Sequence, residues 1–399
     1  MSEAAERHAA FVAQLRRTAA APAPVLDAFA RVPRHVFLPG VPLDPVYDDD
    51  AIVTHDEDGV PTSSSTQPSL MARMVDLLDV RHGDRVLEIG AGTGYNAAVL
   101  AELGAAVTTV ELLPEVAAAA RRHLRAAGIE TGAAGRGAVQ VVAGDGAAPP
   151  PGPYDRVIFT AGCWSLPAAV VDGLSGDGVL VAPLRINGVE LLMTLRRDGP
   201  ALRGTGGLPC GFLPMRADDG AGRGGDERPW RWPLGAGGAA IADADLGVEG
   251  RGALDRLLAA PGRDAGDPLG LAEDERALDV LLWLGLDGDP LITLLQRGER
   301  RAGWTVALDV LPASLLVFSF ATRFHQVDAT TLYGGDGALR TCAASVAAWR
   351  AVGSPGPEAL SLTVEPAAER TGWSLPARHG GGPATALRGA HRWTLDYGA

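Results

Sequence analysis

Lysine is absent from this chain of 399 residues, so all 35 of its basic residues are arginine. Without a lysine amine there is no Schiff-base nucleophile, no anchor for pyridoxal phosphate and no phosphate-binding lysine of a Walker A loop or a protein kinase. The 48 acidic residues outnumber the arginines, and the net charge of -13 repels phosphate backbones and anionic lipid surfaces. We therefore expect neither nucleic acid nor a membrane as a partner.

Cysteine is also scarce, and its spacing excludes the usual zinc and disulfide-exchange motifs. The three cysteines Cys163, Cys210 and Cys342 form no C-x-x-C pair. Near the N-terminus Glu3 and Glu6 stand where a secretion signal would be basic, and no later segment runs for about 18 apolar residues without a charge. These absences predict a cytoplasmic protein with no metal site.

Short apolar runs alternate with helical patterns between residues 85 and 183. The runs are Val86–Ile89, Val107–Val110, Val139–Ala143, Val157–Thr160 and Val179–Ala182. Strands that alternate with helices predict a doubly wound, mostly parallel sheet, and runs that are apolar throughout are typical of strands covered on both faces. We therefore predict an α/β fold with a Rossmann-like core.

A glycine-rich turn follows the first of these predicted strands. It contains Gly90, Gly92 and Gly94 and leads into a helix that begins near Tyr95. Glycine lets the backbone approach a ligand where a Cβ atom would collide with it. The second strand ends at Glu111, 17 residues after Gly94 (111 − 94), where a carboxylate can accept hydrogen bonds from both hydroxyls of a ribose. The pattern predicts a nucleoside-binding site.

Two nucleoside cofactors compete for this site. A dinucleotide site would normally have the spacing G-x-G-x-x-G, with a pyrophosphate at the helix N-terminus. Here the spacing is G-x-G-x-G, and the acidic Glu88 on the preceding strand suits a cationic ligand, which favours S-adenosylmethionine (SAM) over NAD or FAD. Asp145 and Gly146 follow the third strand, and Asp145 is predicted to bind the edge of the adenine. The alternative is a turn without a ligand, because an aspartate between two glycines is also typical of turns.

Six blocks of the chain, taken in order, resemble the protein-L-isoaspartate O-methyltransferases. The blocks are Phe29–Phe37, Tyr47–Asp50, Ser64–Pro68, Asp84–Tyr95, Gly144–Gly146 and Tyr154–Gly162. The resemblance covers about half of the chain, from Asp27 to Met215. It implies methyl transfer from SAM to a peptide carboxylate, giving an ester that a neighbouring backbone nitrogen attacks to form a succinimide.

The hydroxyl-rich segment of residues 62–67, expected to be a loop, is the predicted catalytic element. A carboxylate with a pKa of about 4 is already ionised at neutral pH, so the enzyme needs only to position it. The resemblance places the family's active-site serine at Thr66 and assigns Asp49 to the substrate side. From the hydroxyls of the segment itself, Ser65 is the next catalytic candidate and Ser64 is expected to bind the substrate. The alternative for the hydroxyls is a solvated loop or a helix N-cap.

Four segments are predicted along the chain. Residues 1–80 would supply N-terminal helices and the active-site loop, 81–215 the SAM-binding core, 216–238 a glycine-rich linker, and 239–399 a further α/β domain that recognises the peptide substrate. The glycine-containing stretch Gly199–Gly211 is also expected to be irregular. The sequence leaves the oligomeric state open.

Two features depart from the ordinary repair enzyme: threonine at the serine position and the C-terminal extension. They resemble the branch that methylates a normal aspartate in cyclised ribosomal peptides, the lanthipeptides and graspetides, and leaves an aspartimide. We favour that branch, and repair of isoaspartate in damaged proteins is the alternative. A small-molecule methyltransferase or a non-enzymatic peptide-binding module fits less well, because the substrate-side blocks, the glycines and Glu111 are all present.

Overall fold

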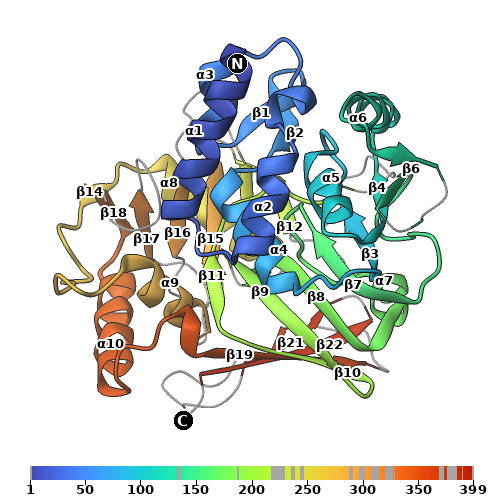
Figure 1. The fold of residues 1–399 in the computed structure, drawn as a ribbon. Helices are drawn as coiled ribbons and strands as arrows, with labels where there is room; N and C mark the ends of the chain where they lie inside the picture. Colours follow the sequence, from blue (N-terminus) through green and yellow to red (C-terminus); the bar gives the residue numbers. More distant parts are fainter. Residues whose placement is uncertain are drawn as a thin grey trace.

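The core of the protein is a 13-stranded sheet that extends from the N-terminal half into the C-terminal part of the chain (Figure 1). The computed structural model describes residues 2–132, 135, 137–186, 188–216, 230–234, 239–242, 247–286, 291–295, 302–306, 314–319, 327, 329–367, 373–374, 384–388 and 390–397. In spatial order the strands are β20 (Trp373–Ser374), β21 (Ala384–Arg388), β22 (His391–Tyr397), β19 (Leu360–Pro366), β10 (Ala201–Thr205), β9 (Val189–Asp198), β8 (Leu174–Ile186), β7 (Tyr154–Phe159), β3 (Arg85–Ile89), β4 (Ala106–Glu111), β6 (Ala138–Ala143) and β5 (Glu130–Thr131), and β11 (Gly207–Pro209) pairs with β9.

The strands β5, β6, β4, β3, β7 and β8 pair with one another in parallel. This arrangement confirms the predicted α/β fold with a mostly parallel core sheet. From β8 onward the pairing is antiparallel, because β8, β9 and β10 follow one another along the chain and turn back directly. The stretch Gly199–Gly211, expected to be irregular, forms β10 and β11 instead, since each finds a partner strand in β9.

Helices cover both faces of the parallel core. On one face Val86 and Val107 belong to a buried cluster with residues of α1 (Glu3–Thr18), α2 (Ala23–Arg31), α4 (Pro68–Leu78), α5 (Tyr95–Glu102) and α6 (Pro114–Ala126). On the other face Leu87 and Val110 belong to a cluster with α7 (Ala168–Asp172) and with helices of the C-terminal part. Adjacent strand residues point to opposite faces, so runs that are apolar throughout are buried on both sides.

A β-hairpin stands apart from the main sheet and leads into α4. It consists of β1 (Ile52–Glu57) and β2 (Val60–Ser65), which pair only with each other. Asp58 and Gly59 at its tip both have positive φ, 52° and 78°, as a two-residue hairpin turn requires. Most of the expected hydroxyl-rich loop is therefore a strand, and the Asp-Gly pair is the sequence signal for it.

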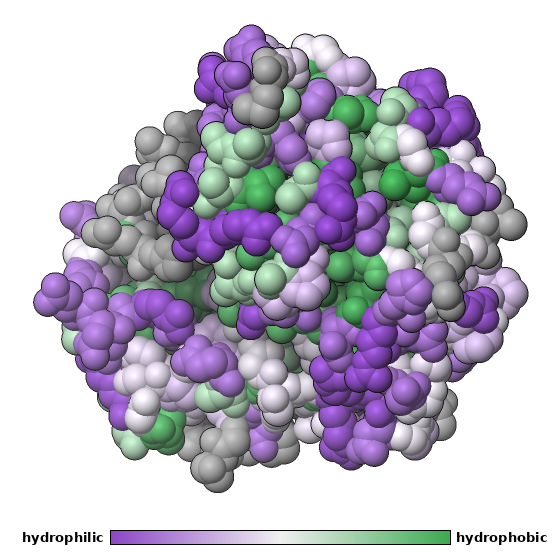
Figure 2. Space-filling model, in the orientation of Figure 1, coloured by the Kyte–Doolittle hydropathy of each residue, from purple (hydrophilic) through white to green (hydrophobic). Residues whose placement is uncertain are grey.

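The short α3 (Leu43–Tyr47) and the 3-10 turn η1 (Arg34–Phe37) connect α2 to this hairpin. Figure 2 shows hydrophilic side chains spread across one face of the molecule, with hydrophobic ones in separate patches between them. The large apolar side chains exposed in the described part of the chain are Val53, Val60, Leu208, Val248 and Val352. None of the described helices is both long and apolar enough to cross a bilayer.

The C-terminal part contains a second, entirely antiparallel sheet. Its strands are, in spatial order, β12 (Trp230–Pro233), β13 (Ala239–Ala242), β15 (Leu291–Leu295), β16 (Ala302–Val306), β17 (Ser314–Ser319), β18 (Ala329–Gly334) and β14 (Arg263–Asp264). The helical elements here are α8 (Gly247–Ala259), α9 (Ala277–Leu286), α10 (Gly337–Ala351) and the 3-10 turn η2 (Pro357–Ala359). Of the predicted linker 216–238, residues 217–229 and 235–238 lie outside the described residues, and Trp230–Pro233 form β12.

The last strands of the chain are joined directly to the main sheet. β19 pairs with β10, with Leu202 opposite Val364, and extends the sheet through β22 to β21. The buried guanidinium of Arg388 lies 5.0 Å from the ring centre of Trp164 and 4.8 Å from that of Trp393, and it donates a hydrogen bond to the Trp164 carbonyl at 3.0 Å. That residues 239–399 form an independent domain stays a prediction. The contacts of β19 and Arg388 join this region closely to the core.

We expect a chain that ends after residue 238 to aggregate or to unfold at a markedly lower temperature. It would leave β10 without its partner β19 and would uncover Leu202, which is fully buried. Size-exclusion chromatography and thermal unfolding of this chain would be compared with the full-length variant Arg392→Ala, which changes an exposed residue of β22. A soluble truncated chain with an unchanged melting temperature would contradict the expectation.

Candidate active site

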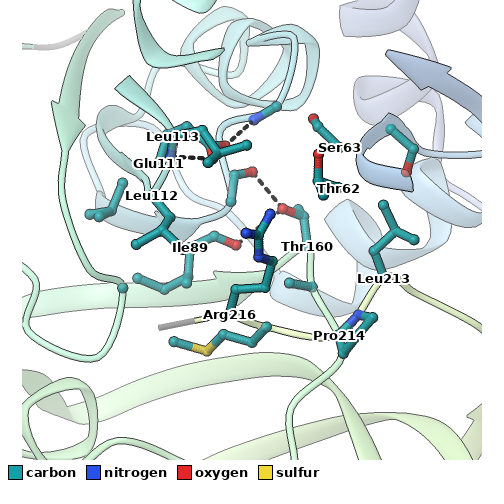
Figure 3. A pocket seen from close by; sticks show the side chains of 17 residues that line it. Thr62, Ser63, Ile89, Glu111, Leu112, Leu113, Thr160, Leu213, Pro214 and Arg216 are labelled. Atoms are coloured by element: carbon teal, nitrogen blue, oxygen red, sulfur yellow. Dashed lines mark hydrogen bonds between the residues drawn. The ribbon is translucent and has the colours of Figure 1, made fainter. Parts of the chain in front are cut away.

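A cavity opens at the carboxyl ends of the parallel strands β3, β4 and β7 (Figure 3). Its volume is about 670 Å³, including the part that is open to solvent. The lining residues are Thr62, Ser63, Ser64, Ile89, Gly90, Gly92, Val110, Glu111, Leu112, Leu113, Gly146, Thr160, Ala161, Leu213, Pro214, Met215 and Arg216. Ligands of open α/β sheets bind at this edge, because the loops that follow the parallel strands converge there.

Two glycines bring the first turn close to the other walls of the cavity. Gly90 has φ +100°, and a Cβ atom there would lie 2.6 Å from Oγ1 of Thr160. Gly92 has φ +50°, and its Cβ would lie 3.4 Å from the carbonyl oxygen of Ser64 and 3.7 Å from Oγ of Ser63. At both positions glycine is favoured because φ is positive and because a Cβ atom would lie close to neighbouring atoms. The turn and the hairpin therefore face each other across a narrow gap.

Glu111 lies at the end of β4, where the sequence places a ribose-binding carboxylate. Its Oε2 accepts a hydrogen bond from the Gly92 amide at 2.9 Å, and its Oε1 accepts one from the Leu113 amide at 3.2 Å. A carboxylate has about four acceptor sites, so each oxygen keeps capacity for a further donor. The two amides hold Glu111 against the cavity with acceptor capacity left for a pair of hydroxyls.

Gly146 and Asp145 occupy the turn after β6. Gly146 lines the cavity, and a Cβ atom there would lie 2.4 Å from Cγ2 of Ile89 and 3.3 Å from Cε of Met215. Oδ1 of Asp145 accepts a hydrogen bond from the Ala147 amide at 2.8 Å, which stabilises the turn. Asp145 is not among the lining residues, so its contact with an adenine stays a prediction.

Glu88 and Tyr95 are buried below the glycine turn and do not line the cavity. Glu88 accepts a hydrogen bond from Nδ2 of Asn96 at 2.7 Å, and burial raises the pKa of its carboxyl to about 7. The Tyr95 ring packs 5.8 Å from Phe29 and 5.4 Å from Phe37, between ring centres, and burial raises the pKa of its hydroxyl. Both residues therefore lie in the protein interior behind the glycine turn.

Gly94 supports the site in a different way. It precedes α5 with φ +85°, and a Cβ atom there would lie 3.3 Å from the Ala120 carbonyl oxygen of α6. The residue lets α5 and α6 pack closely and is not among the lining residues. Direct contact of Glu88, Gly94 and Tyr95 with SAM stays a prediction.

The hydroxyl-bearing segment divides between two environments. Thr62, Ser63 and Ser64 line the cavity from β2. Ser65 is buried and its Oγ accepts a hydrogen bond from Nη2 of Arg34 at 3.3 Å, whereas Thr66 offers its backbone carbonyl to the same nitrogen at 3.2 Å. The catalytic roles of Thr66 and Ser65 stay predictions, and the cavity adds Thr62 and Ser63 as candidates.

Arg34 is fully buried and connects this segment with the acidic turn before it. Besides Ser65 and Thr66, its guanidinium donates to the backbone carbonyls of Val46 at 2.9 Å and of Asp48 and Asp50 at 3.1 Å each. These carbonyls lie where regular structure ends, so they have no partner within a helix or strand. One side chain thus fixes the positions of two loops.

Asp49 caps the helix that follows the hydroxyl-bearing segment. Its Oδ1 accepts a hydrogen bond from the Ser69 amide at 2.8 Å, and its Oδ2 accepts one from Nε2 of Gln67 at 3.1 Å. A carboxylate is favourable at a helix N-terminus because the first amides there have no partner within the helix. Asp49 is not a lining residue, so its contact with substrate stays a prediction.

Sequence reasoning missed several residues that line the cavity. Thr160 directly follows β7 and donates a hydrogen bond to the Gly90 carbonyl at 2.6 Å, which connects the ends of two neighbouring strands. Leu213, Pro214, Met215 and Arg216 form a wall after β11. A polar residue at the end of a predicted strand would have indicated Thr160, whereas no local pattern marks residues 213–216 as part of a site.

The half of the chain that builds the cavity is similar to known methyltransferases. A family model described as protein-L-isoaspartate(D-aspartate) O-methyltransferase matches residues 6–219, just over half of the chain. The chain belongs to this family. A protein-L-isoaspartate O-methyltransferase from Methanoregula boonei is 40% identical over 181 residues, which cover 45% of this chain and 78% of that protein. One from Aeropyrum pernix is 34% identical over 230 residues, 55% of this chain and 84% of that protein.

A solved structure extends the likeness beyond the residues that the family model matches. A protein titled protein-L-isoaspartate O-methyltransferase aligns with a TM-score of 0.50 and 23% identity, over 89% of this chain and 96% of that one. This likeness shows the fold, and it reaches into the C-terminal part. As a member of this family the chain is a SAM-dependent O-methyltransferase. The solved protein shares its fold over most of the chain.

The residues of the cavity fit SAM. Glu111 has free acceptor capacity for the two ribose hydroxyls, and at Gly92 and Gly146 a side chain would intrude on the space between the turns. Apolar side chains of Ile89, Leu112 and Met215 border the same space, as a nucleoside base requires. Glu111 and the glycine turn would hold the cofactor from the side of the sheet.

The variant Glu111→Ala is expected to bind SAM about 10- to 100-fold more weakly, since a hydrogen bond to a charged group contributes about 1.5–3 kcal/mol. Isothermal titration calorimetry with SAM measures the change, and circular dichroism checks the fold. The control is Glu130→Ala, which removes an exposed carboxylate on β5. Equal SAM affinity of the Glu111 variant and wild type would refute the ribose assignment.

The raised pKa of Glu88 predicts that stability falls as the pH rises. In the unfolded chain this carboxyl loses its proton near pH 4.5, whereas in the folded protein it keeps the proton up to about pH 7. Between these values the folded state binds more protons, so the free energy of unfolding decreases with pH, by about 1.4 kcal/mol for each unit that the pKa is raised. The variant Glu88→Gln should lose much of this dependence.

Chemical denaturation at pH 5 and pH 8 would test this expectation. The buried Glu190 has its pKa raised to about 7 as well, chiefly by burial, so Glu190→Gln should flatten the remaining dependence. The exposed Glu115→Gln is the control. If wild type and Glu88→Gln lose equal stability between the two pH values, the raised pKa of Glu88 is wrong.

Proposed function

We propose that this protein transfers the methyl group of SAM to the carboxylate of an isoaspartyl residue in a protein or peptide. The observation that supports it most is the juxtaposition of two elements in one cavity. The turn with Gly92, beside Glu111, suits a nucleoside and lies close to β2: a Cβ atom on Gly92 would be 3.4 Å from the Ser64 carbonyl oxygen and 3.7 Å from Oγ of Ser63. The relatives that match this half of the chain are named for the same activity.

The protein's own contribution to the reaction is to position the acceptor. When bound, SAM supplies a methyl group on a positively charged sulfur, which a carboxylate oxygen takes to give a neutral methyl ester. The acceptor is already ionised at neutral pH, so no side chain has to remove a proton. The hydroxyls of residues 62–66 can donate hydrogen bonds to one carboxylate oxygen and leave the other free to react. Such positioning alone can supply several kcal/mol of the barrier.

Repair of isoaspartate is now better supported than aspartimide formation in a cyclised peptide. The C-terminal extension does not favour the peptide-modifying branch, because a solved protein-L-isoaspartate O-methyltransferase has a similar fold over 89% of this chain. Threonine in place of serine at position 66 retains the hydroxyl. Neither feature therefore separates this chain from enzymes named for isoaspartate.

A role of residues 239–399 in peptide recognition would act outside the cavity. The described lining residues end at Arg216, so the C-terminal part contributes none of them. Its attachment to the core through β19 and Arg388 could nevertheless present a surface beside the cavity. The acceptor itself would be held by residues of the first 216 positions.

Mass spectrometry of peptides incubated with the protein and SAM tests the proposed function. An isoaspartyl peptide should gain one methyl group and then lose methanol as the succinimide forms, while the same peptide with normal aspartate should remain unchanged. Methylation of a macrocyclic aspartyl peptide but not of the isoaspartyl peptide would move the protein to the peptide-modifying branch. No methylation of either peptide would refute carboxyl transfer to peptides.

Variants of the hydroxyl-bearing segment separate the candidate catalytic groups. We expect Thr66→Val to lower kcat at least tenfold with SAM affinity within a few fold of wild type, because it deletes the hydroxyl and keeps the shape. Thr66→Ser should remain active. Ser64→Ala is the matched comparison, since Ser64 lines the cavity directly. If Thr66→Val turns over like wild type and Ser64→Ala does not, the positioning hydroxyl belongs to Ser64.

A further inference from the structure

Arg216 is the one basic side chain among the described residues that line the cavity. It follows Pro214 and Met215 in the wall after β11, and in Figure 3 its side chain rises between Ile89 and Thr160. The one acidic residue in the same lining is Glu111, which is already bound to two backbone amides. SAM itself carries a positively charged sulfur, so binding of this cofactor does not explain why an arginine lines the cavity.

In the structure Arg216 already binds a carboxylate. Glu57, near the tip of the hairpin, binds it with both oxygens: Nη1 to Oε1 and Nη2 to Oε2 are each 3.1 Å. The hydrogen bonds from Arg216 hold the pKa of the Glu57 carboxyl below its usual value. This is the parallel two-bond arrangement in which arginine recognises any carboxylate, including one on a substrate.

The pair is placed so that a substrate could displace Glu57. Side-chain exposure is 41% for Arg216 and 47% for Glu57, and exposed ion pairs contribute little to stability. Glu57 belongs to the same hairpin as Thr62, Ser63 and Ser64, and Arg216 lines the same cavity as these residues. A carboxylate between them would meet donors from both sides.

We propose that Arg216 binds the acceptor carboxylate of the substrate and that Glu57 holds the same position in its absence. This inference rests on the proposed carboxyl methyl transfer. One oxygen of the acceptor would be held by the guanidinium, with the hydroxyls of the hairpin on the other side. Because Glu57 competes for Arg216, it weakens binding of every acceptor and favours those with a free carboxylate over their amides.

The first test is a comparison of kinetics among three variants. With an isoaspartyl peptide, Arg216→Gln should raise KM at least tenfold, and Arg216→Lys should fall between it and wild type because lysine has no planar fork. Glu57→Gln should lower KM about threefold, since it removes the competing charge. The control is Arg203→Gln, which breaks a similar exposed pair with Asp198 at 2.7 Å, away from the cavity lining.

The second test measures binding without turnover. Calorimetry with saturating S-adenosylhomocysteine would compare the isoaspartyl peptide with its twin in which the acceptor carboxylate is a carboxamide. Wild type should prefer the carboxylate peptide, and Arg216→Gln should lose that preference with unchanged affinity for S-adenosylhomocysteine. Weaker binding of S-adenosylhomocysteine to Arg216→Gln would assign the arginine to the cofactor and overturn the proposal.

The two proposals fail in different ways. If wild type methylates isoaspartyl peptides and Arg216→Gln has an unchanged KM, the role of Arg216 is refuted and the proposed function stands. If wild type methylates none of them, the proposed function is refuted, and the binding comparison still decides the role of Arg216. Equal binding of carboxylate and carboxamide peptides to wild type, or binding of neither, would overturn it.

Discussion

The hydroxyl-bearing segment beside the cavity depends on one buried cation. The guanidinium of Arg34 donates to four backbone carbonyls and to the Ser65 hydroxyl, which joins the acidic turn of residues 48–50 to the end of the hairpin. Unpaired buried carbonyls are costly, so the loops around them cannot move without breaking several charge-assisted hydrogen bonds. Arg34 therefore fixes the end of the hydroxyl-bearing segment relative to the acidic turn.

The cofactor side is built on a different principle, the convergence of parallel strands. β3, β4 and β7 end at one edge, and each contributes the residues that follow it: the glycine turn, Glu111 and Thr160. Hydrogen bonds between these ends, such as Thr160 to the Gly90 carbonyl, make the edge rigid. The cavity is thus a junction between a rigid edge and a hairpin, and the hairpin is attached to the opposite wall through Glu57 and Arg216.

The C-terminal part extends the main sheet of the protein. β19, β22 and β21 continue the antiparallel half of the main sheet, and the largest buried cluster contains residues from both β8 and α9. The boundary expected from composition separates regions that share a core. A solved protein-L-isoaspartate O-methyltransferase has a similar fold over 89% of this chain, so the likeness in fold reaches into the C-terminal part.

The sequence by itself determined the α/β class, the order of the core strands along the chain, and the cofactor turn with Glu111 at the neighbouring strand end. These features follow from the spacing of apolar residues, from apolar runs and from turn-forming residues, which are all local properties of the sequence. Only the tertiary structure decided that Ser64 lines the cavity while Ser65 turns toward Arg34, that Arg216 meets Glu57, and that β19 pairs with β10. Each of these joins residues distant in the chain, and such contacts arise from packing of the whole fold rather than from any local pattern.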